Sequence, residues 1–291
     1  MIRRALILAL TLTSLTAAQA QATGGAGYLA SRQTLSGGFA EPGGPASVSL
    51  TEWAVMGLKA ASRSPATMRR SGGRTPVGFL AGYAKSWHDA YSLERGILAA
   101  VALGTNPRTF AGRDLVRALR STVNATSGRI GSYSNSTYWG VLAFRAAGAT
   151  PPSRSLAYIR RQQGASGGYG YAPGAGADSN DTAAAVMALR SGGAPCNVTA
   201  VAHAYDFMHS LQRSDRGYAL NASAGSDSQS TSWVVQARIK CGLINTGALS
   251  YLAARKRSSG AYEYRAGLVL TPAWVTAQVL PAVNGRAYPI R

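Results

Sequence analysis

Short apolar runs recur along this chain, each with polar residues before it and a glycine behind it. Three such segments align without a gap: SNSTYWGVLAFRAAG from Ser134, SNDTAAAVMALRSGG from Ser179 and SQSTSWVVQARIKCG from Ser228. A Ser/Thr/Asp cluster before an apolar run is typical of a helix N-cap, and a glycine after it is typical of a C-cap. The pattern therefore predicts repeated α-helices, with Ser134 and Ser228 among the capping residues.

Three further segments fit the same frame. VSLTEWAVMGLKAA from Val48 supplies a tryptophan, VLTPAWVTAQVLPAVNG from Val269 supplies another, and AYSLERGILAAVALG from Ala90 keeps the length and the closing glycine. Internal repeats of this kind indicate one supersecondary unit used several times. We therefore expect the tryptophans of these segments to share one repeat position; they are Trp53, Trp139, Trp233 and Trp274.

A second helical segment precedes most copies. Gln33, Gln163 and Gln212 each stand six residues before an aromatic residue that directly follows a glycine. Each unit is thus a helix, a glycine-rich turn, a polar cap and a second, more apolar helix. Six units of about 45 residues are typical of helical-hairpin repeats. Because the second helices are apolar on all sides and the first are amphipathic, we predict an all-α fold, an α/α toroid with about twelve helices in an inner and an outer ring.

The first residues have the features of an export signal. Arg3 and Arg4 precede an apolar stretch that ends in small residues, so residues 1–22 are predicted to be a cleaved signal peptide. Residues 23–291 then form a single toroid domain that is secreted, periplasmic or located in the cell envelope. No later apolar run is long enough to span a bilayer, so we expect no transmembrane segment.

The chain has two cysteines, Cys196 and Cys241. An even pair in an oxidising compartment indicates a disulfide. A metal site is the alternative, but none of the three histidines stands at ligand spacing from either cysteine. We predict a structural disulfide and no metal site.

The charge is strongly unbalanced. Lys and Arg number 30 against 11 Asp and Glu, which gives a formal net charge of +19. Such an excess fits an anionic partner or surface. Solvated outer faces explain most of the basic clusters, and in an exported protein the alternative is attachment to an anionic polymer of the cell envelope or to lipid head groups. Basic residues cluster in three short runs, namely Arg69–Arg70 with Arg74, Arg160–Arg161 and Arg255–Arg257. Because no aromatic residues are interleaved with these runs, we expect no nucleic-acid partner.

Two longer segments resemble a known repeat. RQTLSGGFAEPGGPASVSLTEWAVMGLKAA from Arg32 and RQQGASGGYGYAPGAGADSNDTAAAVMALRSGG from Arg161 are similar to the prenyltransferase/squalene oxidase repeat. The resemblance covers about residues 30 to 290 and implies the toroid of terpene cyclases and of protein prenyltransferase β subunits. Related toroids also occur in cobalamin carriers and in complement-like thioester domains, so the resemblance implies the fold more specifically than the activity.

The resemblance points to one candidate catalytic motif. Class II terpene cyclases have the pattern Asp-x-Asp-Asp-Thr-Ala, and this chain has Asp178-Ser-Asn-Asp-Thr-Ala183 there. The family's proton donor is the middle carboxyl, and its place is taken by Asn180, whose amide cannot act as a strong acid. Asp178 and Asp181 remain as a candidate catalytic pair, with helix capping as the alternative role.

Two other family chemistries lack their residues here. Neither cysteine stands in the Asp-x-Cys context of the zinc site of protein prenyltransferases, and no Gly-Cys-Gly-Glu-Gln thioester motif is present. We therefore expect no cofactor and no metal.

The tryptophans Trp53, Trp139, Trp233 and Trp274 have two interpretations. If they point inward, they form an aromatic cavity suited to an isoprenoid, a sugar or a planar ligand. The alternative is ordinary packing between helices. The sequence thus predicts an exported toroid that binds a ligand or partner at its central cavity without cyclase activity. The alternative is an enzyme of the terpene cyclase/mutase type, or another toroid-type lyase or hydrolase, that uses Asp178 and Asp181.

Overall fold

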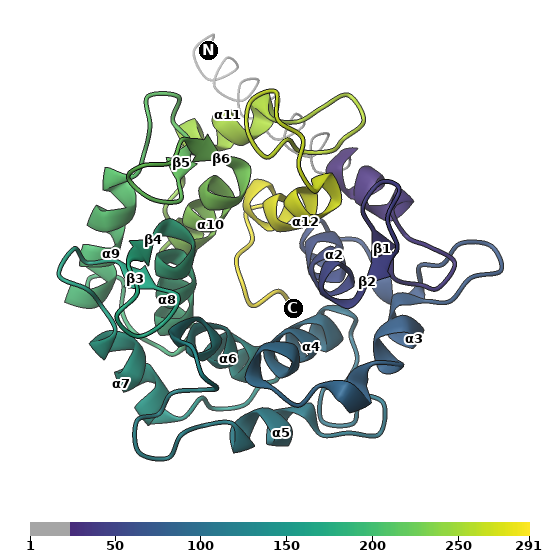
Figure 1. The fold of residues 1–291 in the computed structure, drawn as a ribbon, viewed down its shortest axis with the longest axis horizontal. Helices are drawn as coiled ribbons and strands as arrows, with labels where there is room; N and C mark the ends of the chain where they lie inside the picture. Colours follow the sequence, from purple (N-terminus) through teal and green to yellow (C-terminus); the bar gives the residue numbers. More distant parts are fainter. Residues whose placement is uncertain (1–23) are drawn as a thin grey trace, which may run out of the picture.

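The computed structural model describes residues 24–291, so the predicted signal peptide at residues 1–22 lies outside the described part. An inner ring of helices surrounds the centre of the molecule (Figure 1). Each inner helix contacts the next one, and the last contacts the first, which closes the ring. The inner helices are α2 (Val48–Ala60), α4 (Ala90–Ala102), α6 (Ser134–Ala146), α8 (Ser179–Ser191), α10 (Ser228–Ile239) and α12 (Pro272–Val283).

A second set of helices lies outside this ring and alternates with it along the chain (Figure 1). The outer set consists of a helix at 24–31, α3 (Pro76–Ala81), α5 (Leu115–Ser121), α7 (Ser153–Arg161), α9 (Thr199–Ser210) and α11 (Thr246–Ala254), with short 3-10 turns η1 (Pro65–Thr67) and η2 (Ala84–Ser86). The inner helices are buried on nearly every side, whereas the outer helices expose one face. The predicted all-α toroid is confirmed.

Small antiparallel hairpins, which the sequence did not predict, lead into three of the inner helices. They pair β1 (Phe39–Ala40) with β2 (Ala46–Ser47), β3 (Tyr169–Gly170) with β4 (Ala177–Asp178), and β5 (Tyr218–Ala219) with β6 (Ser226–Asp227). In the second hairpin Tyr169 stands opposite Asp178. These hairpins are the glycine-rich turns of the repeat, and they place the start of each inner helix on one face of the ring.

A buried threonine marks the same position in five inner helices. Its Oγ1 accepts a hydrogen bond from a backbone N–H in the turn that precedes the helix. The pairs, with N–O distances, are Phe39 to Thr51 (2.9 Å), Ile130 to Thr137 (3.0 Å), Tyr169 to Thr182 (2.8 Å), Tyr218 to Thr231 (2.9 Å) and Tyr262 to Thr276 (3.0 Å). This bond ties each turn to its helix and defines the repeat frame physically.

The threonine frame corrects one expectation about the tryptophans. Trp53, Trp139 and Trp233 each stand two residues after the threonine. Trp274, in contrast, stands two residues before Thr276, and Gln278 occupies the tryptophan position of α12. The four tryptophans therefore do not share one repeat position. Since residues four apart lie on the same helix face, Trp274 lies one turn nearer to the start of its helix.

The predicted caps are displaced by one residue. Ser134 and Ser228 are the first helical residues of α6 and α10, whose N-caps are Tyr133 and Asp227. The Ser228 hydroxyl instead donates to the carbonyl of Glu263 at 2.6 Å, and the Ser134 hydroxyl hydrogen-bonds to the Tyr158 hydroxyl at 3.2 Å. Both serines thus connect an inner helix to a neighbouring segment.

The predicted disulfide is present between Cys196 and Cys241, with an S–S distance of 2.06 Å. It joins the loop after α8 to the segment that follows α10, so it links two successive repeats. Within residues 24–291, no group of His, Cys, Asp and Glu is arranged to hold a metal ion. No helix in this range is both long and apolar enough to cross a membrane.

Candidate functional site

The centre of the ring is filled by aromatic side chains. Trp53 of α2, Trp139 of α6 and Trp233 of α10 meet there edge to face, with ring centroids 5.2 to 5.6 Å apart. Trp274 of α12 lies against Trp53, with centroids 6.1 Å apart. The four tryptophans therefore face the centre of the ring, where their side chains also pack against one another.

The C-terminal segment leaves the end of α12 and runs into the middle of the ring (Figure 1), beside the ends of α2 and α10. Tyr288 is fully buried, and its ring lies 5.7 Å from that of Trp53, 5.4 Å from Trp139 and 5.6 Å from Trp233. The tryptophan cluster and Tyr288 together block the lumen.

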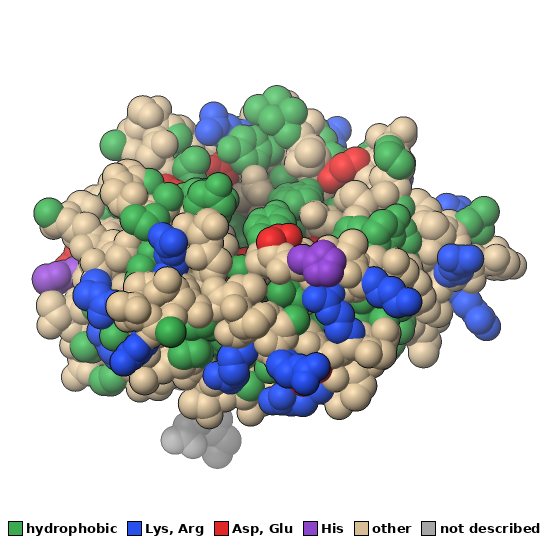
Figure 2. Space-filling view, turned by 60° about the horizontal axis from the view of Figure 1, so that its bottom comes forward, with side chains coloured by type: hydrophobic (Ala, Val, Ile, Leu, Met, Phe, Trp, Pro, Cys, Tyr) green, Lys and Arg blue, Asp and Glu red, His purple; other side chains and the backbone are tan. Residues whose placement is uncertain are grey.

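Above the tryptophan cluster is a pocket of about 260 Å³, on the face where the inner helices begin. Figure 2 shows this face hollowed in the middle, with hydrophobic side chains in the hollow and acidic side chains around it. The pocket is lined by Trp53, Arg95, Asn135, Trp139, Asp178, Asn180, Asp181, Leu220, Gln229, Trp233, Trp274 and Gln278. It therefore brings together both carboxyls and all four tryptophans that the sequence analysis selected.

Apart from Asp178 and Leu220, which precede inner helices, the lining residues come from the first turns of the inner helices. The deeper layer is the sixth residue after each N-cap, which is tryptophan in α2, α6 and α10 and Arg95 in α4. The outer layer consists of residues that stand four positions before the deeper-layer residue of the same helix, and it contains amides. These amides are Asn135, Asn180 and Gln229, the second residues of the three aligned Ser-(Asn/Gln)-x-Thr segments.

Sequence reasoning missed five residues of this pocket: Arg95, Asn135, Leu220, Gln229 and Gln278. Asn135 and Gln229 could have been found from the alignment, because an amide follows the first serine in all three gapless copies. Arg95 and Gln278 carry no such signal, since they replace tryptophan in the copies that fit the repeat least well.

Asp178 and Asp181 are side by side at the start of α8. Asp178 is the N-cap, and its Oδ1 accepts the backbone N–H of Asp181 at 2.8 Å. The Asp181 carboxyl accepts a hydrogen bond from the Asn135 side-chain amide at 2.5 Å, across to α6. Capping is thus an observed role of Asp178, while Asp181 faces the pocket.

Burial raises the pKa of both carboxyls, and for Asp181 the neighbouring Asp178 charge raises the pKa further. Two carboxyl groups in contact cannot both ionise easily, because each disfavours the charge of the other. The pair therefore retains a proton at pH values where an isolated aspartate is ionised. It can then both donate and accept hydrogen bonds toward a ligand.

The positive charge of the pocket belongs to Arg95. Its guanidinium lies 4.8 Å from the ring centroid of Trp53 and 4.0 Å from that of Tyr91, which are cation–π distances. Two buried acids lie near it, Glu52 and Glu94. Burial raises the pKa of Glu52 to about 8 although Arg95 lowers it, and the pKa of Glu94 is also raised by burial. Glu52 is therefore mainly protonated near neutral pH.

Exposed tyrosines stand at the rim of the same face. Tyr133 precedes α6 and Tyr171 follows β3, and their ring centroids are 4.7 Å apart. Tyr91, near the start of α4, also lies at this rim, and all three tyrosines are more than 40% exposed. Flat aromatic side chains that stay exposed are available to stack on a ligand.

No protein-family model matches this chain, and no curated protein matches it in sequence. Solved structures do share its fold. A protein from Actinoplanes is 16% identical with a TM-score of 0.68, and the match covers 92% of this chain and 99% of that one. A type II terpene cyclase from Scytonema in complex with geranylgeranyl dihydroxybenzoate is 13% identical with a TM-score of 0.66, covering 94% and 98%.

A structure described as a glycosidase is 14% identical with a TM-score of 0.63, again covering 94% of this chain and 98% of that one. At these identities the likeness shows the fold alone. The terpene cyclase and glycosidase structures therefore show that this chain has the same toroid architecture. The prenyltransferase/squalene oxidase type of the repeat stays a prediction.

Proposed function

We propose that this protein binds a small polyhydroxylated ligand, such as one unit of a sugar, in the pocket above the tryptophan cluster. The observation that carries the proposal is the layered lining. Trp53, Trp139 and Trp233 form an apolar aromatic floor, and amides and a protonated carboxyl pair surround it one helical turn higher. A sugar ring has the matching chemistry, with C–H groups on its face and hydroxyls at its edge.

The size of the pocket supports a small ligand over an isoprenoid. Its volume of about 260 Å³ lies just below the range of about 300–1,000 Å³ that is usual for ligand sites. The ring centre, where a long polyprenyl chain would extend, is occupied by the tryptophans and Tyr288. The wall also has five polar side chains beside its two carboxyls, namely Arg95, Asn135, Asn180, Gln229 and Gln278.

The rim supports a ligand longer than one unit. Tyr133 and Tyr171 lie together at the mouth, where an adjacent sugar unit of a chain would stack. With export of the protein, which the disulfide favours, the source of such a chain is a polymer of the cell envelope or its surroundings. Localisation in the cell envelope or outside the cell is part of this proposal.

The alternative function is an enzyme that uses Asp178 and Asp181. One observation favours it, the raised pKa of Asp181, because a carboxyl that is protonated near neutral pH is suited to general acid catalysis. Geometry favours binding instead. Glycoside hydrolysis uses two carboxyls on opposite sides of the bond, about 5–9.5 Å apart. Here the two carboxyls touch, and within residues 24–291 no other Asp or Glu lines the pocket.

The test is a titration of the mature protein with monosaccharides and short oligosaccharides, followed by tryptophan fluorescence and calorimetry. We expect saturable binding, with a change in emission because the ligand covers the tryptophans. Gln229→Ala should weaken binding by about tenfold, since each lost hydrogen bond to a buried ligand contributes roughly 1 kcal/mol or more. Asn106→Ala is the matched control, because Asn106 is an exposed amide outside the pocket.

Two outcomes would overturn the proposal. If no saccharide changes the tryptophan emission while geranylgeraniol does, the ligand is an isoprenoid. If an oligosaccharide is cleaved and Asp181→Asn abolishes cleavage without weakening binding, the protein is an enzyme.

A further inference from the structure

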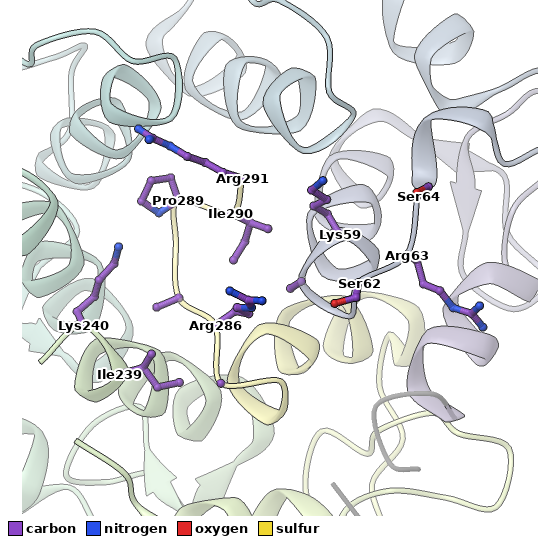
Figure 3. A pocket seen from close by; sticks show the side chains of 13 residues that line it. Lys59, Ser62, Arg63, Ser64, Ile239, Lys240, Arg286, Pro289, Ile290 and Arg291 are labelled. Carbon is purple, nitrogen blue, oxygen red and sulfur yellow. The ribbon is translucent and has the colours of Figure 1, made fainter. Parts of the chain in front are cut away.

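A second pocket opens on the opposite face of the ring, where the inner helices end. Its volume is about 610 Å³, and it shares no lining residue with the pocket above the tryptophans. The walls are the ends of α2 and α10 and the C-terminal segment from Gly285 to Arg291 (Figure 3). The tryptophan cluster and Tyr288 lie between the two pockets.

This second pocket is basic. Lys59 comes from the last turn of α2, Lys240 is the C-cap of α10, and Arg286 and Arg291 belong to the C-terminal segment. Figure 3 shows Lys240 and Arg286 on the two sides of the C-terminal segment, with Lys59 on the side of Arg286, while Arg63 turns to the outer side. No Asp or Glu side chain is among the lining residues.

These cations form no ion pair within residues 24–291. None of the side chains of Lys59, Lys240, Arg286 and Arg291 makes a hydrogen bond or an ion pair there. Burial lowers the pKa of Lys240 to about 8, and the positive charges of Arg291 and Arg190 lower it further. The local potential is therefore positive, and an anion would relieve the repulsion between these groups.

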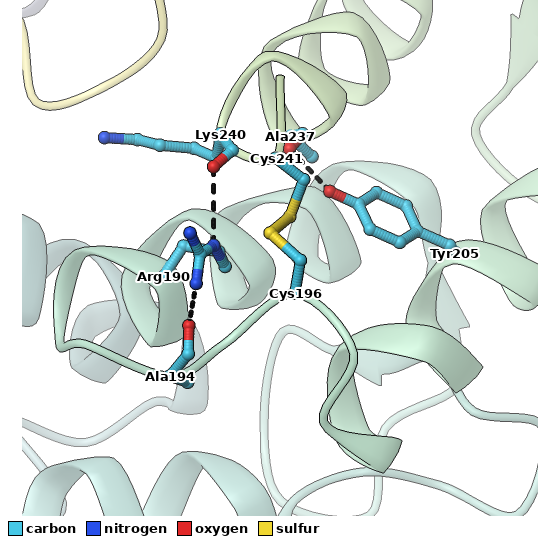
Figure 4. Close-up of a disulfide and its surroundings, with 7 residues drawn as sticks. All are labelled: Arg190, Ala194, Cys196, Tyr205, Ala237, Lys240 and Cys241. Atoms are coloured by element: carbon cyan, nitrogen blue, oxygen red, sulfur yellow. Dashed lines mark hydrogen bonds between the residues drawn. A yellow bond between two sulfur atoms is a disulfide. The ribbon is translucent and has the colours of Figure 1, made fainter. Parts of the chain in front are cut away.

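The segment that carries Lys240 is held in place covalently. Cys241 follows it directly and is bonded to Cys196, and Arg190 donates from Nε to the Lys240 carbonyl at 3.3 Å and also bonds the Ala194 carbonyl (Figure 4). Arg286 is fixed from the other side, because Tyr288 and Ile290 bury their side chains in the ring. The backbone that carries Lys240 and Arg286 is thus fixed before any ligand arrives, so binding has to order only the side chains.

Neutralisation of helix dipoles explains only part of this arrangement. A lysine in the last turn of a helix, such as Lys59, interacts favourably with the negative helix end. Arg286 and Arg291 lie beyond the end of α12 at Val283, on a segment without helical structure. Their convergence with Lys240 needs a different reason.

We propose that this basic pocket is a second binding site, for a small ligand that carries several closely spaced anionic groups. Arginine and lysine side chains bind phosphate and carboxylate groups by charge-assisted hydrogen bonds, and several cations around one space select for dense negative charge. The site is independent of the saccharide pocket, so either proposal can fail without the other.

The test uses inorganic triphosphate and citrate as probes, titrated calorimetrically at low ionic strength. We expect saturable binding with one equivalent of at least one probe. The double variant Lys240→Gln with Arg286→Gln should weaken binding by about tenfold or more, because it removes two charge-assisted contacts. Binding of triphosphate alone identifies a phosphorylated ligand, and binding of citrate alone identifies a polycarboxylate.

The matched control is Arg108→Gln with Arg117→Gln. Both arginines are exposed, lie outside the pocket and donate no side-chain hydrogen bond to residues 24–291, so this variant loses the same net charge. It should leave binding within about twofold of the parent. Equal weakening by the two double variants means unspecific attraction to a basic protein and overturns the proposal, as does the absence of saturable binding by either probe.

Discussion

The carboxylate of Glu41 accepts the backbone N–H of Trp274 at 2.8 Å, although the two residues belong to the first and last described repeats. Its second oxygen accepts the N–H of Ala273 at 2.9 Å. The local N-cap of α12, Thr271, has a left-handed backbone with φ of 39° and caps nothing with its side chain. Glu41 thus caps α12 from across the seam where the ring closes, and it fixes the helix that carries Trp274.

Replacing Glu41 should destabilise the ring at this seam. We expect Glu41→Ala to lower the free energy of unfolding by about 1 kcal/mol, as is typical for a lost N-cap and its favourable interaction with the helix dipole. Glu41→Gln, which keeps one acceptor oxygen, should cost less. Urea denaturation of the three proteins measures both differences, and unchanged stability in the alanine variant would show that the cap contributes nothing.

The hydroxyl of Tyr288 is buried without a hydrogen-bond partner among residues 24–291. Its ring, in contrast, packs on three tryptophans. Tyr288→Phe should therefore leave stability unchanged or raise it by about 1 kcal/mol, because it removes an unsatisfied polar group. Tyr288→Ala should cost about 3–5 kcal/mol through the cavity that it leaves. Thermal and urea unfolding of both variants decide this, and a large loss in the phenylalanine variant would reveal an unseen partner of the hydroxyl.

Glu52 should make stability fall as the pH rises. Its pKa is about 8 in the folded protein against an ordinary value of 4.5, so folding favours the protonated form. The stabilising contribution is complete below about pH 4.5 and is lost progressively up to about pH 8. The total effect is at most about 5 kcal/mol.

The matched variant is Glu52→Gln, which is neutral at every pH. Its free energy of unfolding minus that of the parent should increase between pH 5 and pH 8, and denaturant titrations at several pH values measure this difference. A difference that does not vary with pH would mean that Glu52 is ionised in the folded state.

The disulfide closes a loop over a sequence separation of 45 residues. In the chain-entropy model this stabilises the fold by about 4 kcal/mol. We expect the pair Cys196→Ser with Cys241→Ser to unfold at a correspondingly lower urea concentration. A reductant should destabilise the parent protein and leave the double variant unaffected, and equal stability of the two proteins would contradict the model.

The repeating parts of this molecule could be predicted from the sequence, because periodicity and caps are local signals. Apolar runs between polar caps and glycines were enough to place the inner helices at Ser134, Ser179 and Ser228 to within a residue. Trp274 was assigned to the wrong position because its segment was aligned on the tryptophan. The structure shows that the buried threonine, here Thr276, and not the tryptophan marks the equivalent position of the repeat.

The position of the C-terminal segment could not be predicted. Residues 284–291 have no periodic pattern, and their burial depends on a space that exists only after the ring has closed. The basic runs at Arg69, Arg160 and Arg255, for which an anionic polymer was the alternative to a solvated outer face, do not line the large basic pocket. That pocket combines residues from distant segments, Lys59, Lys240 and Arg286, each of which is unremarkable in its own sequence context.

The contact of α12 with α2 has a consequence for how the protein loses its structure. In an open solenoid the terminal units have one neighbour only, so they fray first and unfolding spreads inward. In this molecule every inner helix is flanked on both sides, and no unit is exposed as a weak starting point. Melting should therefore be a single concerted step, and a circularly permuted chain with new ends in an outer loop should keep the same architecture.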